Sequence, residues 1–182
     1  MTTRDKLKDL IIKTAYFREK ITLSSGKQSD YYIDARIVTL NPQGVLWIAE
    51  IMLEMIKDDD IDAFGGPTLG ADPMIGAVGV LAAQQGRRFN SFIIRKEPKG
   101  HGKQNMIEGP KLKEGGRVVI VDDVATTGKA FVHSLNVLQP LGITVAKAIC
   151  IVDRDEGASE AVAAKGCQLH SIFKASEIHT AS

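Results

Sequence analysis

The sequence predicts an α/β domain with a mainly parallel sheet. After residue 60, short apolar runs typical of strands alternate with longer amphipathic segments typical of helices. The run Val118–Val121 consists of four apolar β-branched residues, which indicates a strand buried on both faces, as in a parallel sheet. A length of 182 residues fits one domain of about 100–200 residues, and the sequence contains no repeat, low-complexity tract or linker.

The first forty residues lie outside this alternation and predict a smaller appended unit. Thr2 is placed to cap a first helix, and Asp5 follows three residues later, as in a capping box. A loop-rich stretch over 22–30 leads into a short strand over 31–34. Pro42 then opens a second helix at its first turn.

Five strands and three helices are predicted after residue 60. The strands span 61–64, 89–95, 118–121, 144–153 and 168–173. The helices begin near Asp72, Gly128 and Ala158 and end near Gly86, Gly142 and Gly166. Asp72 is expected to be the N-cap of its helix, with Pro73 at the first helical position.

Composition narrows the class of protein. The chain has 23 basic and 22 acidic residues, a net charge of +1, which argues against a general nucleic-acid binder. It lacks both a signal-peptide core and the run of about 18 apolar residues that spans a bilayer. Cys150 and Cys167 belong to no C-x-x-C pair and are expected to be buried thiols in a reducing compartment. We therefore expect a cytoplasmic protein with neither a membrane nor a nucleic-acid partner.

A pair of acids and a polar turn follow the buried strand. Asp122 and Asp123 stand at its carboxyl end, where open α/β sheets bind ligands. The turn from Ala125 to Gly128 offers backbone N–H groups and two hydroxyls, which suit a phosphate at a helix N-terminus. A sugar phosphate satisfies both features, since carboxylates bind its hydroxyls and the turn binds its phosphate. The alternative is an ordinary βα junction with a polar turn.

The segment 95–103 gathers four permanent cations and one histidine within nine residues, with glycine and proline between them. Such a composition is typical of a mobile lid that closes on a polyphosphate and stabilises a leaving pyrophosphate. The alternative is a solvated charged loop. The glycine-rich loop Gly65–Ala71 also lies between a strand and a helix, where it would approach a phosphate or serve as a plain turn.

Arg154 follows the strand next to the paired acids and carries a planar guanidinium that suits a carboxylate ligand. The residues alone favour the alternative, a surface ion pair with Asp155 or Glu156. Tyr31 and Tyr32 are adjacent, so in a strand they face opposite sides. One of them is free to face a ligand, although two half-buried aromatic rings would explain the pair equally well.

The segment 118–130 resembles the phosphoribosyl pyrophosphate (PRPP) motif of the type I phosphoribosyltransferases. The segments 25–34, 66–73, 95–103, 107–109 and 153–158 occur in an order that closely resembles the orotate phosphoribosyltransferases, the pyrimidine-pathway branch of that family. The resemblance covers nearly the whole chain. It implies a type I phosphoribosyltransferase fold, with a mainly parallel five-stranded sheet flanked by helices, a small hood over about 1–40 and a core over about 41–182.

The resemblance also implies an activity. The enzyme would transfer the 5-phosphoribosyl group of PRPP to orotate, giving orotidine 5′-monophosphate and pyrophosphate in UMP synthesis. It would work as a homodimer with shared active sites, with Mg²⁺ bound mainly through PRPP and no protein metal ligand assigned. Two alternatives stay open: a phosphoribosyltransferase for another nucleobase, and a PRPP-sensing regulator of the same fold.

Residue by residue, the resemblance implies the following roles. The catalytic residues would be Lys99, His101, Asp122 and Asp123. PRPP would contact Arg95, Lys96, Lys99, His101, Lys103, Asp122, Asp123, Val124, Ala125, Thr126, Thr127, Gly128, Lys129 and Ala130. Orotate would contact Tyr31, Tyr32, Thr126 and Arg154. Some family members carry ligand-binding lysines at the positions of Ser24 and Leu69, and this chain lacks both.

Overall fold

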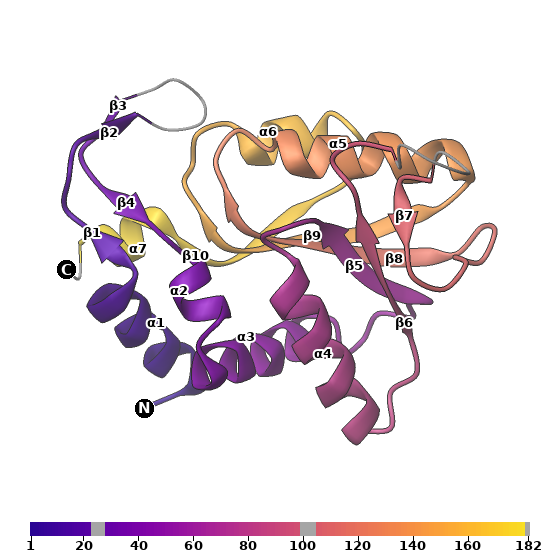
Figure 1. The fold of residues 1–182 in the computed structure, drawn as a ribbon, viewed down its shortest axis with the longest axis horizontal. Coiled ribbons are helices and arrows are strands. Elements are labelled where there is room, and N and C mark those ends of the chain that lie inside the picture. Colours follow the sequence, from indigo (N-terminus) through magenta and orange to yellow (C-terminus); the bar gives the residue numbers. More distant parts are fainter. Residues whose placement is uncertain (23–27, 99–104, 181–182) are drawn as a thin grey trace.

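A six-stranded sheet forms the centre of the molecule (Figure 1). The structure is a computed structural model that describes residues 1–22, 28–98 and 105–180. The strand order is β10-β9-β8-β5-β6-β7. Five strands are parallel: β5 (Ala63–Pro67), β6 (Asn90–Ile94), β8 (Arg117–Ala125), β9 (Thr144–Asp153) and β10 (Leu169–Lys174). The sixth, β7 (Ile107–Glu108), pairs antiparallel with β6. The α/β class is confirmed, but the predicted count of five strands missed β7, because two residues are too few to display alternation.

Helices cover both faces of the sheet (Figure 1). On one face lie α1 (Thr3–Thr14), α3 (Pro42–Met55) and α4 (Asp72–Gln84). On the other lie α5 (Lys129–Leu138), followed by a 3₁₀ turn η1 (Gln139–Leu141), and α6 (Ala158–Ala163). Alternate residues of β8 enter the two cores, with Val119 and Val121 on the first face and Val118 and Ile120 on the second. Burial on both faces explains the unbroken apolar run in this strand.

Short elements at the N-terminal end stand beside the sheet. Strand β1 (Tyr16–Phe17) pairs antiparallel with β4 (Tyr32–Ile33), and β2 (Ile21–Thr22) with β3 (Gln28–Ser29). They are followed by the short helix α2 (Arg36–Thr39). Leu7 and Ile11 of α1 belong to the same core as α3 and α4. The boundary between hood and core near residue 40 therefore stays a prediction. The last helix, α7 (Ala175–His179), packs beside α1.

Local signals explain where most helices begin. Thr2 and Asp5 form the expected capping box of α1, with reciprocal hydrogen bonds of 3.1 and 2.9 Å. The predicted N-cap of α4 was wrong, since Ala71 occupies that position and Asp72 is the first helical residue. The Asp72 carboxylate instead accepts a hydrogen bond from the Thr68 hydroxyl at 2.8 Å, which ties the preceding loop to the helix. Within the described part of the chain, no helix is long and apolar enough to cross a membrane.

Candidate active site

A cavity of about 610 Å³ opens at the carboxyl end of the parallel sheet. The segments that follow β5, β6, β8 and β9 all contribute to its walls, as expected for a ligand site in an open α/β sheet. The N-terminal elements β2, β4 and α2 also contribute lining residues. The lining residues are Ile21, Thr22, Tyr32, Ile33, Asp34, Ala35, Arg36, Pro67, Thr68, Leu69, Gly70, Lys96, Asp122, Asp123, Val124, Thr126, Lys129, Ala130, His133 and Arg154.

Two carboxylates line this cavity at the end of β8. An oxygen of Asp122 accepts a hydrogen bond from the backbone N–H of Asp123 at 2.9 Å. An oxygen of Asp123 accepts a hydrogen bond from the backbone N–H of Val124 at 2.7 Å. A Cβ at Gly70 would lie 2.6 Å from Asp122 Oδ1 and 2.8 Å from Asp123 Oδ1. Only glycine therefore allows the loop after β5 to lie directly against the acid pair.

Burial perturbs both acids. It raises the pKa of Asp122 to about 8, and the negative charge of Asp123 adds to the effect. The pKa of Asp123 is also raised, chiefly by burial. Both shifts favour the protonated form of the pair, whereas a ligand that donates hydrogen bonds to the carboxylates would favour the ionised form.

The raised pKa predicts how stability depends on pH. The pKa of Asp122 is ordinarily 3.8 and is about 8 in the folded protein. At a pH between these two values, the folded state retains a proton on Asp122 that the unfolded chain has released. The contribution of Asp122 to the free energy of unfolding therefore falls as pH rises through this window. We expect Asp122→Asn to remove much of this decline in urea titrations between pH 5 and pH 8. Parallel stability profiles for the wild type and the variant would contradict the assignment.

The segment after the acids forms a compact turn that ends in a helix. Gly128 has φ +75° and is the N-cap of α5, so the turn requires a backbone conformation that favours glycine. The first N–H groups of α5 have no partner within the helix and can bind a phosphate. Val124, Thr126, Lys129 and Ala130 line the cavity, whereas Ala125, Thr127 and Gly128 support the turn without lining it.

Arg154 lines the cavity directly after β9, and its backbone N–H donates to the Ala125 carbonyl oxygen at 2.9 Å, so it lies beside this turn. The residue is only 7% exposed. Its Nε donates to Glu156 at 2.9 Å, and its guanidinium lies over the ring of Tyr31, 4.4 Å from the ring centroid. The ion pair with Glu156 matches the sequence-based alternative, but the pair is buried beside the cavity and not on the surface.

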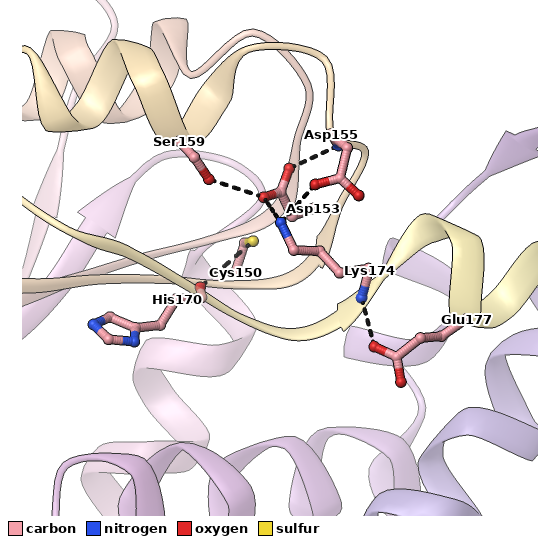
Figure 2. Close-up of polar contacts among 7 residues, drawn as sticks. All are labelled: Cys150, Asp153, Asp155, Ser159, His170, Lys174 and Glu177. Carbon is pink, nitrogen blue, oxygen red and sulfur yellow. Dashed lines mark hydrogen bonds and ion pairs between the residues drawn. The ribbon is translucent and has the colours of Figure 1, made fainter.

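An ionic network holds the turn that carries Arg154 (Figure 2). The Asp153 carboxylate, 1% exposed, accepts hydrogen bonds from Lys174 Nζ at 2.7 Å, Ser159 Oγ at 3.2 Å and the Asp155 N–H at 2.9 Å. Lys174 also donates to Asp155 at 2.6 Å, so one ammonium bridges the carboxylates on either side of Arg154. These two hydrogen bonds raise the pKa of Lys174 and keep it charged.

Removing this ammonium should destabilise the fold. Lys174→Met leaves the buried Asp153 charge without its cation, and the partial exposure of Lys174 moderates the loss to about 2 kcal/mol of the free energy of unfolding. The exposed Lys165 provides a matched control, because its replacement by methionine should change stability by less than about 0.5 kcal/mol. Chemical denaturation measures both variants. Equal stability of the two would contradict the role of Lys174.

The remaining predicted residues have varied positions. Tyr32 lines the cavity, whereas Tyr31 packs against Tyr16 and Arg154. Lys96 lines the cavity, but Arg95 does not, since its guanidinium donates to Glu108 at 3.2 Å. Lys99, His101 and Lys103 lie outside the described residues, as does Ser24.

Two charged or titratable residues of the cavity, Arg36 and His133, carry no predicted role. Arg36, which is held by Asp34 at 3.3 Å, lowers the pKa of Asp123 through its charge and so opposes the effect of burial. His133 lies one helical turn after Lys129, and its Nε2 is 2.9 Å from the Arg95 carbonyl oxygen. The i, i+4 spacing from Lys129 could have identified His133. No sequence signal places α2 next to the acid pair.

Comparisons with known proteins identify the family. The phosphoribosyl transferase domain matches residues 72–179. Over 172 residues the chain is 43% identical to an orotate phosphoribosyltransferase of Nostoc sp., covering 94% of this chain and 83% of that protein. The chain belongs to the orotate phosphoribosyltransferase family. A second member, from Aquifex aeolicus, is 39% identical over 181 residues, which are 98% of each chain.

A solved structure agrees with this assignment. The orotate phosphoribosyltransferase of Mycobacterium tuberculosis in complex with PRPP matches with a TM-score of 0.79 and 32% identity. The match covers 98% of this chain and 99% of that one. The family resemblance deduced from the motifs is therefore confirmed along almost the entire chain.

Proposed function

We propose that this chain transfers the 5-phosphoribosyl group of PRPP to orotate, giving orotidine 5′-monophosphate and pyrophosphate. The observation that carries the proposal is a single cavity lined by both a helix N-terminal turn and a buried guanidinium. The turn suits the 5′-phosphate of the donor. Arg154 suits the carboxylate of the base, and a base without a carboxylate would leave it without a substrate partner.

The reaction breaks the bond from ribose C1 to pyrophosphate and forms a bond from C1 to N1 of the orotate anion. Departure of pyrophosphate builds oxocarbenium character on the ribose, as in glycosyl transfer generally. Asp122 and Asp123, once ionised, accept hydrogen bonds from the ribose hydroxyls and provide negative charge near the developing cation. Thr126, Lys129 and the N–H groups of the turn hold the phosphate, while Tyr32 and Arg154 orient the base.

Cations neutralise the leaving group in this proposal. Lys96 lines the cavity near the acid pair, and we assign it to pyrophosphate. Lys99, His101 and Lys103 would join it from outside the described residues, and Arg95 would have to leave Glu108 to do so. We further propose Mg²⁺ as cofactor. The ionised carboxylates would accept hydrogen bonds from the waters that Mg²⁺ retains, and Mg²⁺ would supply positive charge to the pyrophosphate when bound.

We also propose a cytoplasmic homodimer in which each subunit contributes lid residues to its partner's site. Both cysteines are free and buried, which suits a reducing compartment. Mixing a Lys99→Ala variant with an Arg154→Ala variant should restore partial activity, because one site of a mixed dimer would contain neither substitution. Lack of recovery despite demonstrated subunit exchange would count against shared sites.

The direct test is a turnover assay with a panel of bases. Orotate should be consumed only when PRPP and Mg²⁺ are both present, and pyrophosphate should appear in equal amount. Uracil, adenine and hypoxanthine should react far more slowly. Turnover of a purine without turnover of orotate would favour the alternative of a transferase for another base. Binding of PRPP without turnover of any base would favour a regulator.

A further inference from the structure

Three residues hold Arg154, and one of them, Glu156, has no role in the proposed chemistry. The Nε of Arg154 donates to Glu156 Oε1 at 2.9 Å, its Nη2 donates to Ser29 Oγ at 3.0 Å, and Tyr31 covers its face. Ser29 and Tyr31 come from the N-terminal elements and, with Glu156, line a second pocket that shares Arg154 with the main cavity. Glu156 belongs to the core and contributes no lining to the main cavity.

The Glu156 carboxylate is placed at an energetic cost. The side chain is 19% exposed, and its Oε2 is buried with no hydrogen-bond partner among the residues that the structure describes. A buried carboxylate oxygen without a partner is unfavourable. Its Oε1 bond to Arg154 is therefore the contact that accounts for an acid at this position.

The residues on either side of Glu156 have left-handed backbone conformations. Asp155, between Arg154 and Glu156, has φ +55°, and Gly157 has φ +101°, so the chain reverses direction within the turn from Asp153 to Gly157. Lys174 bridges the carboxylates of Asp153 and Asp155 and prevents the turn from opening (Figure 2). The side chain of Glu156 is thus fixed on the Nε side of the guanidinium.

We propose that Glu156 is a positioning residue that sets the preference for a carboxylated base. By binding Nε, it orients Arg154 so that the remaining N–H groups of Nη1 and Nη2 are available to the carboxylate of the base. Nη1 has no hydrogen-bond partner in the described part of the chain, which is consistent with this role. The inference rests on the proposed function and assigns a further determinant of specificity to the same site.

The test compares substitutions at Glu156 under steady-state conditions. Glu156→Ala should raise the KM for orotate about tenfold or more and reduce the preference for orotate over uracil by a similar factor. The KM for PRPP should change by less than about twofold, because the acid pair and the phosphate turn are untouched. Glu156→Gln still accepts from Nε and should stay close to the wild type. Glu160→Ala, at an exposed acid of the same region, is the matched control.

A double-mutant cycle separates positioning from general stability. In an Arg154→Ala background, Glu156→Ala should have no further effect on turnover with orotate, because Glu156 acts through Arg154. If Glu156→Ala folds poorly, Glu156→Met fills the space without accepting a hydrogen bond and replaces it.

The outcomes distinguish a failure of the Glu156 role from a failure of the proposed function. Normal wild-type turnover of orotate combined with an unchanged orotate KM in Glu156→Ala would overturn the inference alone. So would an equal rise in the KM for PRPP, or the same loss with and without Arg154. Failure of the wild type to use orotate would overturn the proposed function, and this inference with it.

Discussion

Arg154→Ala is expected to lower kcat/KM for orotate at least about a hundredfold. Arg154 is 7% exposed and lines the same cavity as the phosphate turn, so its removal leaves the carboxylate of the base without a partner in a desolvated site. Truncating one member of a buried hydrogen-bonded charge pair costs about 2–5 kcal/mol. Steady-state kinetics with orotate and PRPP varied separately measures the loss.

Two controls sharpen this expectation. Arg154→Lys keeps the charge but loses the planar fork, so its activity should fall between those of the wild type and the alanine variant. The KM for PRPP should stay within about threefold of the wild type in both variants, because Asp122, Asp123 and the phosphate turn are unchanged. A loss that is equal for orotate and uracil would contradict carboxylate recognition by Arg154.

The second large effect concerns the acid pair and has opposite signs for activity and stability. Asp123→Asn should lower kcat about a hundredfold or more, because an amide cannot supply negative charge beside the developing ribose cation. The same substitution should raise the melting temperature at pH 8, since it removes a buried charge whose pKa is raised by burial. Kinetic assays and thermal unfolding of the same preparation measure both changes.

A neutral surface control belongs with this variant. Asp9→Asn alters an exposed acid of α1 and should change neither activity nor melting temperature appreciably. If Asp123→Asn lost activity and stability together, the acid pair would be a structural element, and its proposed role at the ribose would be wrong.

The sequence predicted those features that depend on local order. The apolar run Val118–Val121 required burial on both faces, and the acids that follow it had to lie at the carboxyl edge of the sheet. The turn before α5 was also predictable from local sequence, since Gly128 provides a backbone conformation that few other residues adopt. Such signals lie within a few residues of the structure that they specify.

Features that depend on long-range packing could not be predicted. The residues around Arg154 favoured a surface ion pair, because nothing in them shows that Tyr31 and Ser29, more than a hundred residues earlier, contact its guanidinium. Lys174 follows Arg154 by twenty residues, and only the parallel pairing of β9 and β10 brings it to Asp153. Arg36 lines the same cavity as Asp123 because the fold brings α2 there, and no local pattern around Arg36 indicates this.

In the proposed function, one cavity holds both the phosphate and the carboxylate of the product. A crystal structure of the wild-type protein with orotidine 5′-monophosphate tests this most directly. We expect the 5′-phosphate on the turn from Ala125 to Ala130, the ribose hydroxyls on Asp122 and Asp123, and the carboxylate of the base on Arg154. A product bound with its carboxylate away from Arg154, or with its phosphate away from that turn, would contradict the account.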